Sequence, residues 1–274
     1  TTAMLLLKGE TEYPIFLDKK EKIKVQGNAN NLDHLNIEGN IYNEEFSAFQ
    51  ATLQGPGIPS EKMLEAKAEE FIRQHNNSFV SIYLLDKYFV QKETPDFKKI
   101  KELIDVMAGV LQDKPSIGQL TENITQIEKV NEGKTAPFFS LPNQKGEKVT
   151  RLDKFKDKYM LINFWASWCE ECDSTNVELR KINNKYKKNK EFGILGISLD
   201  INKEDWKNKI KQDTLTWEQV CTFTGWNLET AKQYAILKLP TNILVSPGGR
   251  ILARDIPTDS LSHAIEKVLK KEKK

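Results

Sequence analysis

The chain has 274 residues, enough for two domains of ordinary size and for a core that needs no disulfide support. Its 41 lysines and arginines nearly balance its 39 aspartates and glutamates, and a net charge of +2 offers no basic surface, so we expect no nucleic-acid partner. Three cysteines are too few for a disulfide scaffold, and no apolar stretch approaches the roughly 20 residues that cross a bilayer.

The first 41 residues contain short apolar or alternating runs separated by charged, asparagine or glycine turns. These runs cover residues 4–7, 14–17, 22–26 and 35–39. Such a pattern is typical of a small β-meander. The first run has no partner strand before it, so we expect the sequence to begin inside a domain whose first strands are missing.

From about Asn43 the spacing of apolar residues becomes that of helices. Residues 64–75 and 100–111 each repeat one apolar face, and Pro115 is placed to open a further helix. Residues 79–90 are apolar nearly all round, which predicts the most buried helix. We expect these faces to form a packed core, since helices normally fold through such a face.

After residues 131–137 strands alternate with helices. Residues 159–165 and 192–200 are continuous apolar runs typical of strands buried on both faces, and a helical pattern follows each. Residues 241–256 read as two strands around a Pro-Gly-Gly turn, which is too tight for a crossover and therefore antiparallel. With a closing helix over 261–269, this order predicts an α/β fold whose mixed central sheet is flanked by helices.

The patterns divide the chain into three segments. Residues 1–55 form a partial β-rich domain and residues 56–130 a helical segment, and together they make an N-terminal α+β part. Residues 131–274 form the α/β domain. We therefore expect the chemistry and the preceding α+β part to lie in separate regions of the chain.

Cys169 and Cys172 stand two residues apart where the strand over 159–165 gives way to a helix. Backbone N–H groups at a helix start favour an anion, so Cys169 can attack a disulfide as a thiolate. Cys172, one turn later, can then release the partner by attacking Cys169. We expect both thiols to lie exposed beside a groove.

Other uses of the two cysteines fit the sequence less well. A structural zinc site would need four cysteine or histidine ligands, and only Cys221 and three scattered histidines remain. Covalent haem attachment would need a histidine where Asp173 stands. We therefore favour redox chemistry and expect no metal and no cofactor. Cys221 is predicted to pack in the core.

Three carboxylates, Glu170, Glu171 and Asp173, crowd the two sulfurs and are expected to modulate the pKa of Cys169. One carboxylate about 7 Å away opposes the thiolate by roughly 0.6–2.4 kcal/mol at an effective dielectric of 20–80. That is about 0.4–1.7 pKa units. We predict that the pKa of Cys169 stays near or above neutral and that the pair is poised as a reductant.

Three stretches carry a family resemblance: GKTAPFFSL (133–141), INFWASWCEEC (162–172) and LKLPTNILVSPGGRIL (237–252). Together with the element order they resemble the thioredoxin superfamily, and within it the TlpA- and ResA-like thiol-disulfide oxidoreductases, which are related to the AhpC/TSA proteins. Residues 1–130 resemble the β-then-helical domain of unknown function in bacterial envelope lipoproteins. The resemblance implies a periplasmic or cell-envelope protein, with the option of a lipid anchor on a missing N-terminal segment.

The resemblance also implies roles for single residues. Cys169 is the attacking sulfur, Cys172 the resolving sulfur, and Trp168 the aromatic cover beside the pair. Pro240 matches the family's cis-proline, which would let Leu239 pair main chain to main chain with a substrate peptide. Without the resemblance, Pro240 would be an ordinary trans proline that opens a strand.

The sequence also departs from the family pattern. Glu171 and Val177 stand where the family usually has prolines. Asn163 aligns with the buried carboxylate of thioredoxin, and Thr175 with a glutamate of the ResA-like proteins. Because neither of these two side chains can titrate, no dedicated general base is visible, and water or a nearby glutamate would take the proton from Cys172.

The function implied is the reduction of protein disulfides in the bacterial envelope through a mixed disulfide. Its partners would be a disulfide-bearing protein substrate and an upstream thiol protein that supplies electrons. One alternative is a binding or scaffold module with a redox-silent thioredoxin fold. A second is a peroxiredoxin-type peroxidase, which needs Pro-x-x-x-Thr-x-x-Cys, whereas Ile162 and Ala166 occupy the proline and threonine positions.

Overall fold

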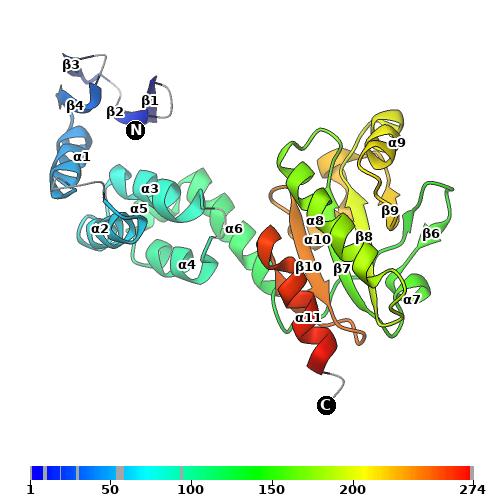
Figure 1. The fold of residues 1–274 in the computed structure, drawn as a ribbon. Coiled ribbons are helices and arrows are strands. Elements are labelled where there is room, and N and C mark those ends of the chain that lie inside the picture. Colours follow the sequence, from blue (N-terminus) through cyan, green and yellow to red (C-terminus); the bar gives the residue numbers. More distant parts are fainter. Residues whose placement is uncertain are drawn as a thin grey trace. The chain divides into compact units, whose positions relative to one another are not determined.

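The computed structural model describes residues 2–8, 11–18, 20–28, 31–53, 59–92 and 95–271. The chain folds into two compact units, Thr1–Thr121 and Glu122–Lys274 (Figure 1). The predicted boundary between residues 55 and 56 lies outside the described residues, and the three-segment division stays a prediction. Within the described ranges, no helix combines the length and apolarity that crossing a membrane requires.

The first unit opens with the predicted strands, which pair as two hairpins. Their bounds are β1 (Thr2–Lys8), β2 (Thr11–Leu17), β3 (Lys24–Asn28) and β4 (Asn31–Glu38). The prediction of one meander is wrong, because β1 pairs with β2 and β3 with β4 in separate two-stranded sheets. The side chain of Asn43 explains the interruption: it accepts from the Phe16 N–H and donates to the Phe16 carbonyl, both at 2.9 Å.

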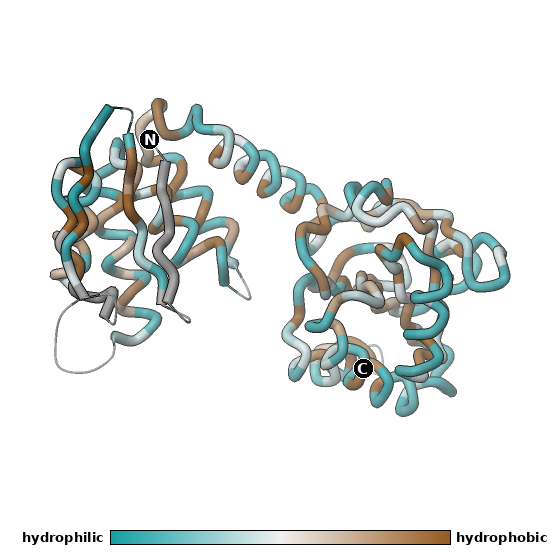
Figure 2. Tube along the Cα trace, turned by 90° about the horizontal axis from the view of Figure 1, so that it is seen from above, coloured by the Kyte–Doolittle hydropathy of each residue, from teal (hydrophilic) through white to brown (hydrophobic). Residues whose placement is uncertain are grey.

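Helices make up the rest of the first unit, and hydrophobic and hydrophilic residues alternate along them (Figure 2). The predicted helix over residues 79–90 is present as α3 followed by a π-helical turn, η1. The bounds are α1 (Ile41–Thr52), α2 (Glu61–Gln74), α3 (Phe79–Leu85), η1 (Asp86–Val90), α4 (Phe97–Asp105), α5 (Gly109–Gln112) and α6 (Pro115–Lys129). The last of these, α6, carries the chain into the second unit.

The single helix predicted over residues 100–111 is wrong, because α4 ends at Asp105 and α5 begins at Gly109. At the break, the Ala108 N–H donates to the carbonyl of Asn76 at 2.9 Å, outside the helix. The Gln112 side chain donates to the carbonyls of Ile104, at 3.2 Å, and Met107, at 2.7 Å. These bonds satisfy backbone groups that the interruption would leave without partners.

The second unit contains a mixed five-stranded sheet in the order β11-β10-β7-β8-β9, which confirms the predicted fold class. Strands β7, β8 and β9 are parallel, and β10 runs antiparallel to both β7 and β11. The bounds are β5 (Leu141–Pro142), β6 (Lys148–Val149), β7 (Tyr159–Trp165), β8 (Phe192–Ser198), β9 (Glu218–Cys221), β10 (Thr241–Val245) and β11 (Ile251–Arg254).

Helices cover both faces of this sheet (Figure 1). Helices α8, α9 and α11 share one core cluster with Leu161 and Trp165 of β7. On the other face, Phe164 of β7 meets Tyr234, which follows α10, with ring centroids 5.6 Å apart. The bounds are α7 (Arg151–Lys154), α8 (Glu171–Tyr186), α9 (Lys203–Gln212), η2 (Gly225–Asn227), α10 (Glu229–Gln233), η3 (Thr258–Ser260) and α11 (Leu261–Lys271).

Arg254, the last residue of β11, links the end of α10 to the sheet through hydrogen bonds. Its guanidinium donates to the carbonyls of Tyr234 and Ala235, both at 2.7 Å, and pairs with Asp255 at 3.1 Å. We expect Arg254→Met to lower the free energy of unfolding by about 2–4 kcal/mol, because two carbonyls and a carboxylate lose their donor. Urea denaturation followed by tryptophan fluorescence measures the loss.

Arg250→Met is the matched control, because Arg250 is exposed and its side chain donates to one carbonyl, that of Gly133, at 3.0 Å. This variant is expected to lose less than about 1 kcal/mol. Equal losses in the two variants would contradict the anchoring role of Arg254.

Candidate active site

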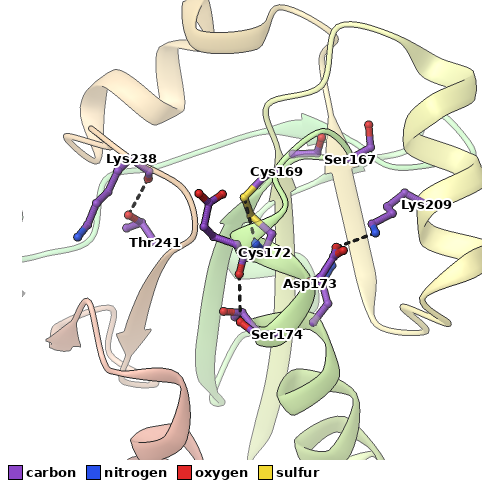
Figure 3. Close-up of a disulfide and its surroundings, with 12 residues drawn as sticks. Ser167, Cys169, Cys172, Asp173, Ser174, Lys209, Lys238 and Thr241 are labelled. Atoms are coloured by element: carbon purple, nitrogen blue, oxygen red, sulfur yellow. Dashed lines mark hydrogen bonds and ion pairs between the residues drawn. A yellow bond between two sulfur atoms is a disulfide. The ribbon is translucent and has the colours of Figure 1, made fainter. Parts of the chain in front are cut away.

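The predicted cysteine pair lies where β7 leads into α8. Cys169 comes two residues before the first residue of the helix, and Cys172 is the second residue of the helix. A disulfide joins them, with their Cα atoms 5.3 Å apart (Figure 3). The structure thus brings together the two sulfurs that the sequence predicted to react with each other.

The start of α8 points a backbone donor at Cys169. The helix begins at Glu171, with Glu170 as its N-cap residue and no side-chain cap bond. The Cys172 N–H donates to the Cys169 sulfur, with 3.2 Å between N and Sγ. Because the N–H groups of a first helical turn have no partners within the helix, this arrangement favours an anionic sulfur at position 169.

The two sulfurs are less accessible than predicted. Cys169 is 4% exposed and Cys172 is fully buried, so the expectation of two exposed thiols is wrong. Both belong to the apolar cluster built on β7, α8, α9 and α11, which covers them. Trp168, in contrast, is 52% exposed. Of the two sulfur-bearing residues, Cys169 alone retains exposed surface, and it follows the exposed Trp168 directly in the chain.

The segment before β10 packs against the same cluster. The Leu239–Pro240 peptide bond is cis, as predicted. Leu239 and Pro240 are both half-buried, and Leu239 contacts the cluster that contains the two cysteines. The Thr241 hydroxyl donates to the Lys238 carbonyl at 2.9 Å, which closes this turn (Figure 3).

The three carboxylates predicted around the sulfurs differ in their surroundings. The Glu170 and Glu171 side chains lie exposed to solvent. Asp173 pairs with Lys209 of α9 at 2.6 Å (Figure 3). Sequence reasoning missed this lysine, which lies 36 residues further along the chain, and so treated Asp173 as unopposed.

Lys209 also lies 3.5 Å from Asp213, and its hydrogen bond to Asp173 is the main cause that raises its pKa. It therefore stays protonated at any pH at which a thiol titrates. Its positive charge offsets part of the negative charge beside the cysteine pair.

Lys209→Met is expected to raise the pKa of Cys169 in the reduced protein. At a separation of about 10 Å, the loss of one positive charge destabilises an anion by roughly 0.4–1.7 kcal/mol at an effective dielectric of 20–80. That is about 0.3–1.2 pKa units. The pH dependence of Cys169 alkylation measures the shift.

Lys207→Met removes a half-buried charge from the same helix and serves as the control, because Lys207 pairs with Glu204 at 3.7 Å rather than with Asp173. A Cys169 pKa that does not move in Lys209→Met, or that moves as far in Lys207→Met, would refute the effect of the ion pair.

The positions aligned with family carboxylates are buried and neutral. Asn163 is 1% exposed, and neither polar atom of its side chain has a hydrogen-bond partner among the described residues. Thr175, also 1% exposed, shares a hydrogen bond with the Thr258 hydroxyl at 3.0 Å. Neither Asn163 nor Thr175 therefore supplies a general base for the Cys172 thiol.

Two buried groups lie at the ends of the neighbouring strands. Cys221, at the end of β9, is 2% exposed, which confirms its predicted place in the core. Its thiol donates to the Asp200 carbonyl at 3.6 Å and accepts from the Phe223 N–H at 3.3 Å, and burial raises its pKa. Asp200, after β8, is 1% exposed and accepts from the Ser167 N–H, and sequence reasoning missed it.

Comparison with known proteins agrees with this geometry. Residues 133–254 match the AhpC/TSA family. The thiol-disulfide oxidoreductase ResA of Bacillus thuringiensis subsp. konkukian (strain 97-27) is 34% identical over 149 residues, which are 54% of this chain and 82% of ResA.

Solved structures extend the comparison. The C-terminal domain of a Bacteroides thetaiotaomicron protein described as a thiol-disulfide oxidoreductase is 56% identical, with a TM-score of 0.51 over 52% of this chain and 99% of that domain. A thioredoxin-like protein from Bacteroides caccae has a TM-score of 0.57 over 76% of this chain and 78% of its own, but at 16% identity it shows the fold alone.

The resemblance of residues 1–130 to a lipoprotein domain stays a prediction. For the second unit, three observations indicate the same family: the match to most of the length of ResA, the fold shared with the Bacteroides thetaiotaomicron domain, and the disulfide between Cys169 and Cys172. The chain belongs to the AhpC/TSA family and, within it, to the ResA-like thiol-disulfide oxidoreductases.

Proposed function

We propose that the protein reduces disulfides of other proteins in the bacterial cell envelope, with Cys169 as the nucleophile and Cys172 as the resolving thiol. The observation that carries the proposal is the asymmetry of the pair. Cys169 retains some exposure and receives the Cys172 N–H at its sulfur, whereas Cys172 is fully buried. The envelope location and an upstream thiol protein as electron donor rest on the family resemblance.

The reaction proceeds by two thiol–disulfide exchanges. The Cys169 thiolate attacks one sulfur of the substrate disulfide, a Cys169–substrate bond forms, and the other substrate sulfur leaves as a thiolate. Cys172 then loses its proton and attacks the Cys169 sulfur, which releases the second substrate thiolate. The substrate gains two electrons and, from solvent, two protons, while the dithiol becomes the disulfide that the donor reduces again.

Substrate contact is assigned to the exposed Trp168 and to the turn at Leu239 and Pro240. Leu239 contacts the apolar cluster that contains both sulfurs. A peptide that lies between these side chains would pass the Cys169 sulfur, and its backbone can pair with that of Leu239. This arrangement suits extended polypeptides rather than small molecules.

The direction of the reaction is proposed to be reduction. The acidic side chains of Glu170 and Glu171 oppose a strongly stabilised thiolate, although Lys209 weakens the contribution of Asp173. With Asn163 and Thr175 neutral, the proton of Cys172 passes to water or to one of the glutamates. A reduction potential near that of the oxidant DsbA, about −120 mV, would contradict this direction.

Insulin reduction tests the function. The protein is expected to accelerate the reduction of insulin disulfides by dithiothreitol, seen as precipitation of the freed B chain. A redox-silent scaffold would leave the rate at that of dithiothreitol alone. A peroxidase would instead consume hydrogen peroxide, and either outcome would overturn the proposal.

A further inference from the structure

A buried carboxylate lies beside the segment that carries Cys169. Asp200 follows β8, the strand that pairs in parallel with β7, and the carboxyl ends of the two strands meet at the same edge of the sheet. The Leu199 N–H donates to the Trp165 carbonyl at 2.8 Å, so the two chains stay paired up to this point. This pairing brings Asp200 next to the residues that lead into the disulfide.

The Asp200 carboxylate accepts hydrogen bonds from two serines. The Ser167 N–H donates to both oxygens, at 3.2 and 3.1 Å, and the Ser167 hydroxyl donates to Oδ1. The Ser198 hydroxyl donates to Oδ2 at 2.6 Å, and the same hydroxyl accepts from the Asp200 N–H at 2.9 Å. The carboxylate is thus held from β8 and in turn holds the segment after β7.

Burial of the Asp200 carboxylate costs free energy, because it removes a charged group from water. Asp200 is 1% exposed, and its donors are all neutral groups. Across the described ranges, no lysine or arginine forms an ion pair with it. A buried carboxylate carries a larger desolvation cost than an amide, but it offers two oxygens that only accept. Two acceptor oxygens suit three donors that come from Ser167, after β7, and from Ser198, at the end of β8.

We propose that Asp200 is a positioning residue that fixes the segment from Ser167 to Cys169. Ser167 is separated from Cys169 by a single residue, the exposed Trp168. The other backbone bond of this turn, from the Cys169 N–H to the Ala166 carbonyl, is long, at 3.3 Å. The hydrogen bonds from Ser167 to the Asp200 carboxylate therefore keep the Cys169 sulfur within reach of the Cys172 N–H.

This inference rests on the proposed function, in which Cys169 is the nucleophile. Its consequence is a rate effect, because a nucleophile displaced by about 1 Å can lose up to roughly 100-fold in rate. Asp200 itself touches no reacting atom. Its effect passes through the backbone of Ser167, so it depends on the acceptor geometry of the side chain rather than on its charge.

The test follows the reaction of the reduced protein with 4,4′-dithiodipyridine in single-turnover mode across a range of pH. Asp200→Ala is expected to slow the fast phase about 10- to 100-fold at every pH. Asp200→Asn, which keeps an acceptor for the Ser167 N–H, is expected to react within about twofold of the parent. Recovery by the amide is a readout that general loss of stability would not produce.

Asn143→Ala is the matched control. The Asn143 side chain also accepts from two backbone N–H groups, of Lys145 and Glu147, both at 3.0 Å, and it donates to Glu218 at the other end of the parallel strands. This variant is expected to react within about twofold of the parent. Should Asp200→Ala not fold, Ser167→Ala removes the hydroxyl donor alone and is expected to react about threefold more slowly.

Several outcomes would overturn the inference. Asp200→Ala could react as fast as the parent, or be slowed no more than Asn143→Ala. Asp200→Asn could be as slow as Asp200→Ala, or Ser167→Ala could match the parent. If the parent itself fails to react, the proposed function fails and this inference with it, whereas a reactive parent with an unaffected Asp200→Ala defeats this inference alone.

Discussion

Cys169→Ser is expected to reduce insulin disulfide reduction to the rate of dithiothreitol alone, a loss of at least about 1,000-fold in the contribution of the protein. A serine hydroxyl cannot form the mixed disulfide through which the reaction passes. Cys172 cannot replace the lost nucleophile, because its side chain is fully buried. The initial rate of B-chain precipitation, with protein concentration varied, gives the measurement.

Cys221→Ser is the matched control for this variant. Cys221 lies at the end of the same sheet, is 2% exposed, and has a pKa that burial raises, so it remains a thiol at neutral pH. The control is expected to keep at least half of the parent rate. Residual catalysis by Cys169→Ser, or an equal loss in Cys221→Ser, would show that the nucleophile has been assigned to the wrong sulfur.

Cys172→Ala is expected to turn the protein into a covalent trap for its substrates. Attack by Cys169 still forms the mixed disulfide, but no second sulfur is placed to break it. Incubated with a protein disulfide, the reduced variant should accumulate a complex close to one to one. Non-reducing electrophoresis and mass spectrometry detect this complex, and dithiothreitol should cleave its mixed disulfide.

The double variant Cys169→Ser/Cys172→Ala separates attack at Cys169 from attack at any other thiol. It keeps Cys221 and is expected to form no adduct, since that thiol is buried. An adduct on Cys172 in the single variant Cys169→Ser would instead mean that the roles of the two sulfurs are reversed. The same trap, applied to an extract of the cell envelope, would name the physiological substrates.

The sequence predicted those features of the second unit that depend on neighbouring residues. Residues 159–165 are apolar except at Asn163 because β7 is buried on both faces, and the structure places this strand at the same residues. The Pro-Gly-Gly turn likewise predicted the hairpin of β10 and β11. The cysteine pair is a local motif as well, since its two residues are three positions apart at the start of one helix.

What the sequence could not predict depends on contacts between distant segments. Lys209 meets Asp173, and Asp200 meets Ser167, only because β8 and α9 fold back beside the end of β7. Neither residue belongs to a spacing pattern that would single it out among the 41 lysines and arginines or the 39 acidic residues. The burial of Cys172 was missed for the same reason, because α9 and α11 supply part of its cover.

The Asn43 amide has a consequence for the association of one molecule with another. Exposed strand edges are where foreign strands add and where fibrils begin, because unpaired N–H and C=O groups invite a partner. At Phe16 both groups on the outer side of β2 are already occupied by one side chain from α1. Asn43 thus prevents a further strand from pairing with the hairpin at Phe16.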